Sequence, residues 1–300
     1  LVESALPSHQ ENAAELLELI MPYTGDSIRI GISGAPGVGK STFIESFGNH
    51  VISEGHKVAV LAVDPTSSVS GGSILGDKTR MEVLSREDDA YIRPSPAGKT
   101  LGGVTRRTRE TLLLCEAAGF DIIFVETVGV GQSETAVAEM TDMFLLLLSP
   151  GGGDELQGIK RGIMELADLV LVNKSDGDQL AAAGRTVSDY QMALQFLHNR
   201  SVNWQARVQT MSSLNNQGID SVWHAVTEYR QLLEKAGEIS SRRTSQSCAW
   251  MWSETADALL EDLKKSQSVM SLVEDLEGDI KKGILPPTVA ARRLIQQFKK

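Results

Sequence analysis

Short apolar runs alternate with longer amphipathic segments over the first 235 residues of the chain. The runs are continuous in their apolar character, as strands buried on both faces are, and the segments between them repeat their apolar residues at helical spacing. The runs fall at residues 28–33, 58–63, 90–93, 121–126, 142–148, 168–172 and 204–211. The helical segments fall at 41–53, 79–84, 104–118, 178–198 and 219–235. Repeated strand–helix units predict an α/β fold with a doubly wound, mostly parallel sheet and helices on both faces.

Two helical regions flank this alternating part. The first 27 residues predict one amphipathic helix, roughly Glu11 to Met21, stopped by Pro22 and Gly25. From residue 240 onward the pattern is helical, with almost no strand signal. We therefore expect an N-terminal helical segment over 1–27, a nucleotide-binding domain over 28–239, and a helical C-terminal arm over 240–300.

The C-terminal arm carries more apolar residues than some sixty helical residues can bury among themselves. Examples are Leu259, Leu260, Leu263, Leu294, Ile295 and Phe298. We therefore expect the arm to contribute to the interface of a homodimer.

Composition narrows the possible functions mainly by exclusion. The chain has 300 residues, a net charge of −10 and a sequence pI near 5.1, which argues against nucleic acid or an anionic membrane as the main partner. The longest apolar run, residues 143–148, is too short to span a bilayer. The two cysteines, Cys115 and Cys248, are expected to be inert core thiols in a reducing compartment. The expected location is the cytoplasm, or the mitochondrial matrix if a leader has been removed.

A glycine-rich stretch joins the first predicted strand to the helix that follows it. It runs Gly34, Ala35, Pro36, Gly37, Val38, Gly39, Lys40, Ser41, Thr42 and fits the pattern G-x-x-x-x-G-K-[ST]. The glycines let the backbone wrap a phosphate, and the N–H groups at the helix start supply partial positive charge. Lys40 can reach the β and γ phosphates, and the Ser41 hydroxyl is placed to ligate Mg²⁺. The motif predicts a binding site for the phosphates of a nucleotide.

A second motif, at the end of a later strand, is typical of guanine recognition. Residues 173–176 fit N-K-x-D. The Asp176 carboxylate can accept hydrogen bonds from N1–H and the exocyclic amine of guanine, whereas adenine presents a different edge. Asn173 suits the opposite side of the base, and the Lys174 stem can cover its face. After the last strand, Ser212 and Ser213 would close over the base through backbone contacts, although a plain loop is the alternative there.

Acidic residues at neighbouring strand ends are candidates for a metal site. Asp64 follows the second strand, Glu126 ends another core strand, and Asp77 lies beyond a glycine-rich loop. With Ser41 they could surround a Mg²⁺ ion that bridges two phosphates, or each could be a helix cap or a surface ion pair. Gly129 holds the place of the glycine in the D-x-x-G of many GTPases, where it could donate its N–H to the γ phosphate. Because glutamate replaces aspartate in that pattern, direct ligation by Glu126 stays open.

The same residues suggest how hydrolysis would proceed. Lys40 and the loop amides would stabilise charge on the phosphoryl group while water attacks in line. No glutamine directly follows Gly129, so slow basal turnover is expected, and Gln132 is the candidate for ordering the attacking water.

Together these residues resemble the G3E group of P-loop GTPases, and more closely its MeaB/MMAA (ArgK-like) branch. The resemblance runs through residues 34–42, 64–68, 72–81, 102–104, 126–134, 151–154 and 173–176, and it covers nearly the whole nucleotide domain. It implies a P-loop NTPase fold, GTP/GDP and Mg²⁺ as cofactors, and Asp64, Asp77 and Glu126 around the metal. It also implies that Lys160 belongs to a third switch region. The N-terminal helix and the helical arm are similar to that branch as well.

The resemblance further implies a GTPase chaperone that gates cofactor loading and protects adenosylcobalamin-dependent methylmalonyl-CoA mutase, which would be its partner. Two other functions stay open. One is a small-molecule, amino-acid transport-linked kinase, although Asp176 speaks against it because kinases of this class mostly take ATP. The other is a nucleotide-bound adaptor without useful hydrolysis.

Overall fold

The structure is a computed structural model that describes residues 1–4, 6–63, 81–94, 101–127, 133–151, 161–197 and 200–299. Residues Leu1–Thr244 form one compact unit and residues Ser245–Lys300 form a second. Each unit is described by itself.

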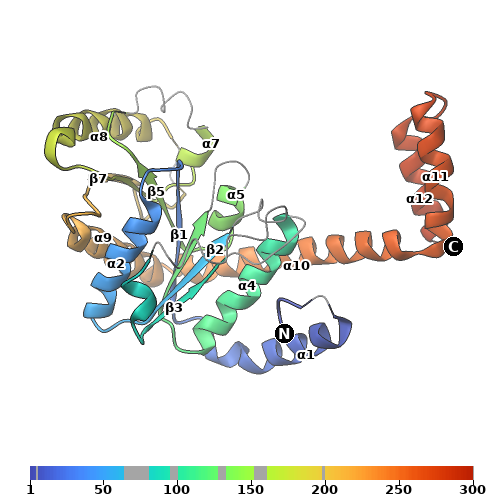
Figure 1. The fold of residues 1–300 in the computed structure, drawn as a ribbon, viewed down its shortest axis with the longest axis horizontal. Helices are drawn as coiled ribbons and strands as arrows, with labels where there is room; N and C mark the ends of the chain where they lie inside the picture. Colours follow the sequence, from blue (N-terminus) through green and yellow to red (C-terminus); the bar gives the residue numbers. More distant parts are fainter. Residues whose placement is uncertain are drawn as a thin grey trace. The chain divides into compact units, whose positions relative to one another are not determined.

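The first unit is built on a seven-stranded sheet within the described residues, in the order β3-β2-β4-β1-β5-β6-β7, and every pair of neighbours is parallel (Figure 1). The strands are β1 (Ile28–Gly34), β2 (Val58–Val63), β3 (Ala90–Arg93), β4 (Ile122–Thr127), β5 (Met143–Leu148), β6 (Leu169–Val172) and β7 (Arg207–Thr210). All residues of β2, β4, β5 and β6 are buried, as both faces of a covered parallel sheet require. The predicted α/β class and parallel sheet are confirmed.

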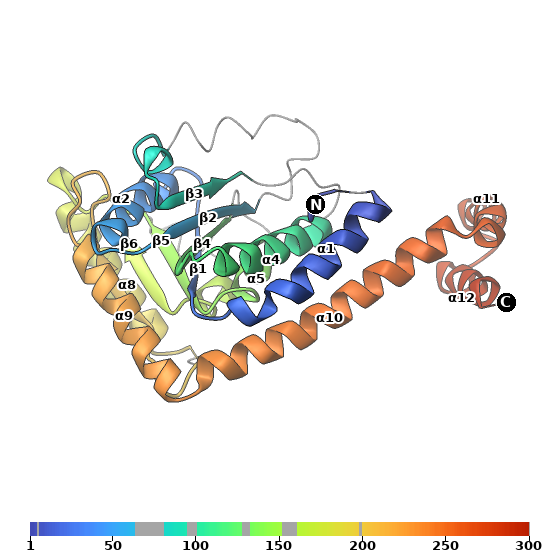
Figure 2. The same ribbon diagram turned by 90° about the horizontal axis from the view of Figure 1, so that it is seen from below.

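Helices cover both faces of this sheet. The helices of the first unit are α1 (Pro7–Ile20), α2 (Lys40–Ser53), α4 (Leu101–Ala117), α5 (Ser133–Ala138), α7 (Arg161–Met164), α8 (Leu180–Leu194) and α9 (Ile219–Lys235). Short 3-10 helices are η1 (Met21–Tyr23), η3 (Leu84–Arg86) and η4 (Gly177–Gln179). Figures 1 and 2 show α2 and α9 on one face, where Phe47 and Tyr229 join the core, and α4 and α5 on the other.

The N-terminal helical segment is part of the first unit. Helix α1 packs against α4, and Figure 2 shows the two side by side. At the far end of α4, the Gly25 amide and the Ser27 hydroxyl both donate to the Glu116 carboxylate. These contacts hold the segment that precedes β1 against the sheet.

The segment around residue 84 differs from its prediction. A helix was expected over 79–84, but among the described residues 81–83 form a turn and the 3-10 helix η3 follows. The amides of Val83 and Leu84 donate to Oε1 of Glu45, on α2, over 2.7 and 3.3 Å. A carboxylate on another helix therefore accepts hydrogen bonds from the amides at the start of this 3-10 turn. The local sequence does not reveal that partner.

Other element boundaries shift by a few residues. Helix α4 begins at Leu101 rather than at residue 104, and α8 ends at Leu194 rather than near 198. Strand β7 begins at Arg207, not at Trp204, because the Trp204 indole N–H donates to the carbonyl of Asp168 over 2.8 Å and the ring packs edge-on against Tyr229.

The second unit is helical. Helix α10 (Glu238–Lys265) begins in the first unit and continues into the second, which also holds α11 (Gln267–Lys281) and α12 (Pro287–Phe298). Helices α11 and α12 contact each other, with Val269 and Leu276 buried on the one and Ala290 on the other. None of the described helices is long and apolar enough to cross a membrane.

The two cysteines differ in their surroundings. Cys115 is buried in α4, and burial raises the pKa of its thiol to about 12, which fits an inert core thiol. Cys248 lies exposed on α10, so the expectation that it is also a core thiol is wrong. Its position in a helix was predictable, but the side of the helix that faces solvent was not.

Candidate functional site

The predicted site residues divide into those that the structure describes and those outside it. The described ones are the stretch 34–42, Glu126, Asn173, Lys174, Asp176, Ser212 and Ser213. Asp64, Asp77, Gly129, Gln132 and Lys160 lie outside the described residues. Because every described strand pair is parallel, β1, β4 and β6 all end at one edge of the sheet, and the described residues gather there.

The turn between β1 and α2 needs glycine for two reasons. Gly34 and Gly39 have positive φ angles of 153° and 95°, which side chains rarely adopt. There is also no room for a side chain. A Cβ on Gly34 would lie 2.5 Å from the carbonyl oxygen of Leu147, and one on Gly39 would lie 2.7 Å from Nδ2 of Asn173. The loop is therefore pressed against β5 on one side and against the end of β6 on the other.

Lys40 begins helix α2 and lies within the loop that precedes it. The side chain is largely buried, and its Nζ donates to the carbonyl of Gly34 over 2.9 Å and to that of Ala35 over 3.4 Å. The ammonium thus sits against the loop backbone at the positive end of α2, where an anion is stabilised. Ser41 follows, half-buried, in the first turn of the helix.

Asn173 connects the glycine-rich loop of residues 34–42, named the phosphate loop after its motif, to the loop after β7. It is buried, and its Nδ2 donates to the carbonyl of Val38 over 2.9 Å. Its Oδ1 accepts from the backbone N–H and the hydroxyl of Ser213, over 3.0 and 2.9 Å. Lys174, next in sequence, donates from Nζ to the carbonyl of Gly37 over 2.6 Å. Residues from three separate stretches therefore form one continuous hydrogen-bonded wall.

Asp176 lies beside Ser212 at the other end of this wall. The Ser212 hydroxyl donates to Oδ2 of Asp176, and the backbone N–H of Asn215 donates to that hydroxyl over 3.2 Å. The Asp176 side chain is only half-buried. A carboxylate has about four lone-pair positions, so one serine leaves room for two further donors such as those on the edge of a guanine base.

Glu126 is buried near the end of β4, on the same side of the sheet as α2. Side chains alternate along a strand, and Glu126 is two residues beyond Phe124, whose ring packs 5.4 Å from that of Phe47 on α2. Thr127 points to the opposite face, where its hydroxyl donates to that of Ser33 over 3.0 Å. A carboxylate and the Ser41 hydroxyl are oxygen donors of the kind that Mg²⁺ accepts. Among the described residues, no three His, Cys, Asp or Glu side chains are grouped to hold a metal ion.

Two residues at this edge were not singled out by the sequence. The Ser46 hydroxyl, on α2, donates to Oδ1 of Asn216 over 2.6 Å, and Asn216 has a positive φ of 54°. The run of polar residues from Asn215 to Gly218 is a turn signal that could have drawn attention to Asn216. Nothing in the sequence indicates that its partner would be Ser46.

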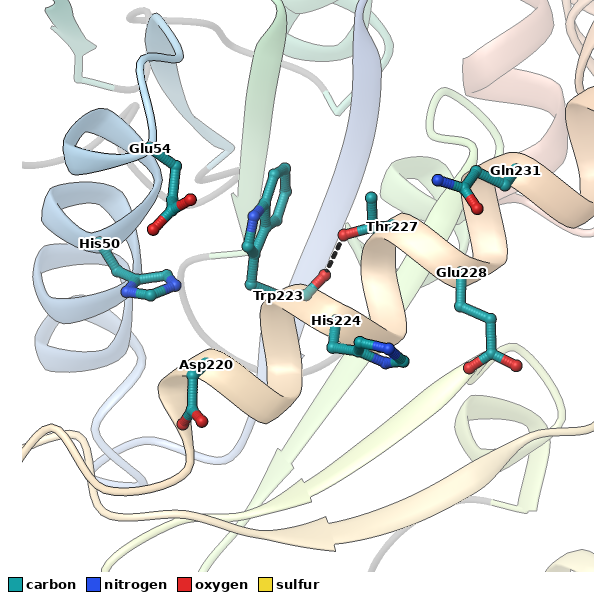
Figure 3. A pocket seen from close by; sticks show the side chains of 8 residues that line it. All are labelled: His50, Glu54, Asp220, Trp223, His224, Thr227, Glu228 and Gln231. Carbon is teal, nitrogen blue, oxygen red and sulfur yellow. Dashed lines mark hydrogen bonds between the residues drawn. The ribbon is translucent and has the colours of Figure 1, made fainter.

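A hollow lies between α2 and α9 (Figure 3). His50 on α2 and Glu54 directly after this helix line one side, and Asp220, His224 and Glu228 line it from α9. The Trp223 ring lies between the two helices and packs edge-on against His56 at 5.0 Å. The hollow lacks a glycine-rich turn of the kind that binds phosphate.

Comparison with known proteins shows which family this chain resembles. The sequence pattern of the family described as "Methylmalonyl Co-A mutase-associated GTPase MeaB" matches residues 1–268. A "Putative GTPase" of Caulobacter vibrioides is 53% identical over 298 residues, which are 99% of this chain and 91% of that protein. The mitochondrial "Methylmalonic aciduria type A homolog" of Mus musculus is 47% identical over 309 residues, covering 100% of this chain and 74% of that protein.

A solved structure, described as that of an "LAO/AO transport system kinase", has a TM-score of 0.78 and 40% identity, covering 100% of this chain and 90% of that one. The P-loop fold and the GTPase class expected from the sequence are thereby confirmed. The chain belongs to the MeaB family of methylmalonyl-CoA mutase-associated GTPases, within the G3E P-loop GTPases.

Proposed function

We propose that the protein binds GTP along the wall formed by the phosphate loop, Asn173 and Ser213, with Asp176 at the guanine edge. The main support for this proposal is the position of Asn173. It contacts the phosphate loop through Val38 and the loop after β7 through Ser213. A single nucleotide lying along such a wall would contact all of these elements. Membership of a GTPase family supports the choice of nucleotide.

In this proposal hydrolysis depends mainly on charge stabilisation. Lys40 and the loop amides neutralise negative charge that develops on the phosphoryl oxygens. Ser41, Asp64, Asp77 and Glu126 would hold Mg²⁺, directly or through water, and a bound Mg²⁺ would neutralise charge on the β and γ phosphates. Gly129 and Gln132 lie outside the described residues. In this proposal Gly129 would donate its N–H to the γ phosphate, and Gln132 would order the attacking water. Slow basal turnover is expected, since no glutamine directly follows Gly129.

Replacing Asp176 with asparagine tests the guanine assignment. Asparagine can still accept from Ser212, but it has lost the charge and one acceptor, so GTP affinity should fall by roughly 2–4 kcal/mol. Xanthosine triphosphate, which has an acceptor where guanine has its amine, should bind better than GTP. Titration of both nucleotides measures the two affinities.

Asp178→Asn is the control for this substitution, because Asp178 lies exposed in η4 two residues further on. It should leave GTP affinity unchanged. Equal affinity of the wild-type protein for ATP and GTP would rule out the guanine assignment.

We further propose that the GTPase cycle gates cofactor loading onto adenosylcobalamin-dependent methylmalonyl-CoA mutase and protects that enzyme. The description of the family as mutase-associated supports this partner. A slow GTPase can act as a signal when a partner protein distinguishes its GTP-bound form from its GDP-bound form. This requires segments whose conformation depends on the γ phosphate. We assign Lys160 to such a segment by resemblance, and it lies outside the described residues.

The mutase should accelerate GTP hydrolysis by the wild-type protein. Lys160→Ala should keep nucleotide affinity within a few-fold and should lose tenfold or more of the stimulated rate, about 1.4 kcal/mol in barrier. Phosphate release measured with and without the mutase gives the stimulated and basal rates. An unrelated enzyme that does not use cobalamin serves as the control partner. If the mutase leaves the wild-type rate unchanged, the chaperone function is wrong, and full stimulation of Lys160→Ala would remove only the role of Lys160.

A kinase is the second candidate, since the solved structure with 40% identity is described as a transport system kinase. The same turnover experiment separates the two functions, because a kinase transfers the phosphoryl group to a small-molecule acceptor instead of releasing phosphate. A nucleotide-bound adaptor would show neither product. Asp176 continues to favour a guanine nucleotide and therefore the GTPase.

The helical arm supports a proposal about assembly. Within the second unit, Leu259, Leu260 and Ile295 are 56%, 50% and 46% exposed, which is high for large apolar side chains. We propose that they contribute to a homodimer interface.

We also propose a location in the bacterial cytoplasm or the mitochondrial matrix, since the relatives include bacterial proteins and a mitochondrial one. Nucleic acid and membranes are not expected as partners.

A further inference from the structure

The loop between β7 and α9 has an unusual backbone. Ser212 and Gln217 pair across it through two backbone hydrogen bonds of 3.0 Å, and Gly218 starts α9 with a φ of 75°. Asn216 and Lys174 are the two non-glycine residues with positive φ in the described part of the chain. Both lie in loops that flank the proposed guanine position. Such conformations cost energy, tend to occur at functional sites and persist where the surroundings fix them.

One side-chain contact fixes this loop to the helix of the phosphate loop. Helix α2 begins at Lys40, and Ser46 lies less than two turns further along it. The Ser46 hydroxyl donates to Oδ1 of Asn216 over 2.6 Å. Both residues line a groove along α2 that reaches Ser213, and Ser213 is hydrogen-bonded to Asn173 of the N-K-x-D motif.

The contact has a direct consequence for the groups that would face the base. Ser212 and Ser213 are in the same loop, and they hold Asp176 and Asn173 through hydrogen bonds. With the loop fastened at Asn216, these two serines keep their places against the N-K-x-D residues. Without that contact the loop would lose one of its attachments, and Ser212 and Ser213 would be less firmly placed against the base edge, while the contacts of Lys40 would remain.

We propose that Asn216 is a positioning residue for guanine recognition, acting through its hydrogen bond to Ser46 and its left-handed backbone. This inference rests on the proposed guanine site. It makes the phosphate helix α2 part of the machinery that selects the base. Loss of the contact should weaken binding of guanine nucleotides and leave the contribution of the phosphate contacts to the affinity unchanged.

The test compares affinities for GDP and ADP, since ADP reports the phosphate contacts without the guanine edge. Asn216→Gly keeps the left-handed backbone and loses the hydrogen bond, and Ser46→Ala loses the same bond from the other side. Each should lower the GDP-over-ADP preference about fivefold, the effect of one typical hydrogen bond. The double variant should be no worse than either single one, because both remove the same contact.

Two further variants sharpen the experiment. Asn216→Asp keeps an acceptor for Ser46 and tolerates positive φ, so it should retain the preference to within twofold of wild type. Asn215→Ala changes the neighbouring side chain of the same loop and should have no effect. Thermal unfolding of each variant shows whether the fold has changed.

The outcomes separate this inference from the proposed function. If the wild-type protein does not prefer GDP, the guanine site itself is wrong and this inference falls with it. If the wild type prefers GDP and Asn216→Gly and Ser46→Ala keep that preference, only the inference is overturned. It is also overturned if both affinities and the melting temperature fall together, since Asn216 would then support the fold alone.

Discussion

Replacing Lys40 with alanine is expected to reduce the affinity for GTP by a hundredfold or more, about 3 kcal/mol. The ammonium lies against the loop backbone, 2.9 Å from the carbonyl of Gly34, at the start of α2. From there it would form charge-assisted hydrogen bonds to two phosphates, each contributing roughly 1.5–3 kcal/mol. Hydrolysis should be lost as well, because the same charge stabilises the transition state. Titration with a non-hydrolysable GTP analogue measures the affinity without turnover.

Lys235→Ala is the matched control for this lysine. Lys235 is exposed in the last turn of α9, so its replacement removes one positive charge, as Lys40→Ala does, without touching the site. It should bind GTP as the wild type does. Wild-type affinity in Lys40→Ala would mean that the nucleotide does not bind at this loop.

Arg243→Ala is expected to lower the free energy of unfolding by about 3–5 kcal/mol, because it would leave buried charge without its partner. Arg243 donates from Nε and Nη2 to the two carboxylate oxygens of Asp142, over 2.7 and 2.6 Å. The Asp142 side chain is fully buried. The same guanidinium donates to the carbonyls of Gly25 and Ser27, both over 2.6 Å. The first turns of α10 are thus fastened to the segment before β1 and to the start of β5.

Charges around this arginine agree with that expectation. Burial alone would lower the pKa of Arg243, but the hydrogen bonds and charge of Asp142 raise it overall. Burial alone would likewise raise the pKa of Glu116, yet contacts with Arg29, Ser27 and Arg243 bring the pKa of that carboxyl below its ordinary value. Both groups therefore stay charged in the folded protein at neutral pH. Neither avoids the cost of a buried charge by becoming neutral.

Urea unfolding of residues 1–300 measures the effect of Arg243→Ala. Lys57→Ala is the control, since Lys57 and Asp89 form an exposed pair at 3.5 Å and such pairs contribute little. A loss as small as that of the control would show that the Arg243 contacts are not maintained in solution.

The fold could be predicted from the sequence where local pattern and tertiary environment agree. Strand β2 has the predicted boundaries because each of its six residues is buried, so the apolar run and the strand coincide. The turn at 81–83 could not be predicted, because the amides there donate hydrogen bonds to Glu45. That residue lies on a helix about forty residues earlier in the chain. Contacts of this kind depend on the assembled fold, and a sequence window does not contain them.

The candidate site shows the same division. The stretch 34–42 and residues 173–176 were predictable because their backbone geometry is encoded in consecutive residues. Sequence analysis assigned Asn173 to the base, but its hydrogen bond to Val38 depends on two strand ends meeting at the sheet edge. The bond between Ser46 and Asn216 joins residues 170 positions apart, and neither belongs to a recognised motif.

The position of Asn173 has a consequence for thermodynamic coupling within the site. One buried amide group contacts the phosphate loop through Val38 and the base loop through Ser213, and it lies so close to Gly39 that no side chain fits between them. A ligand fragment that shifted this side chain would disturb both loops, because the same amide group is hydrogen-bonded to each of them. We therefore expect bound pyrophosphate to change the affinity of the protein for guanosine. In this sense Gly39 belongs to the base site as much as to the phosphate loop.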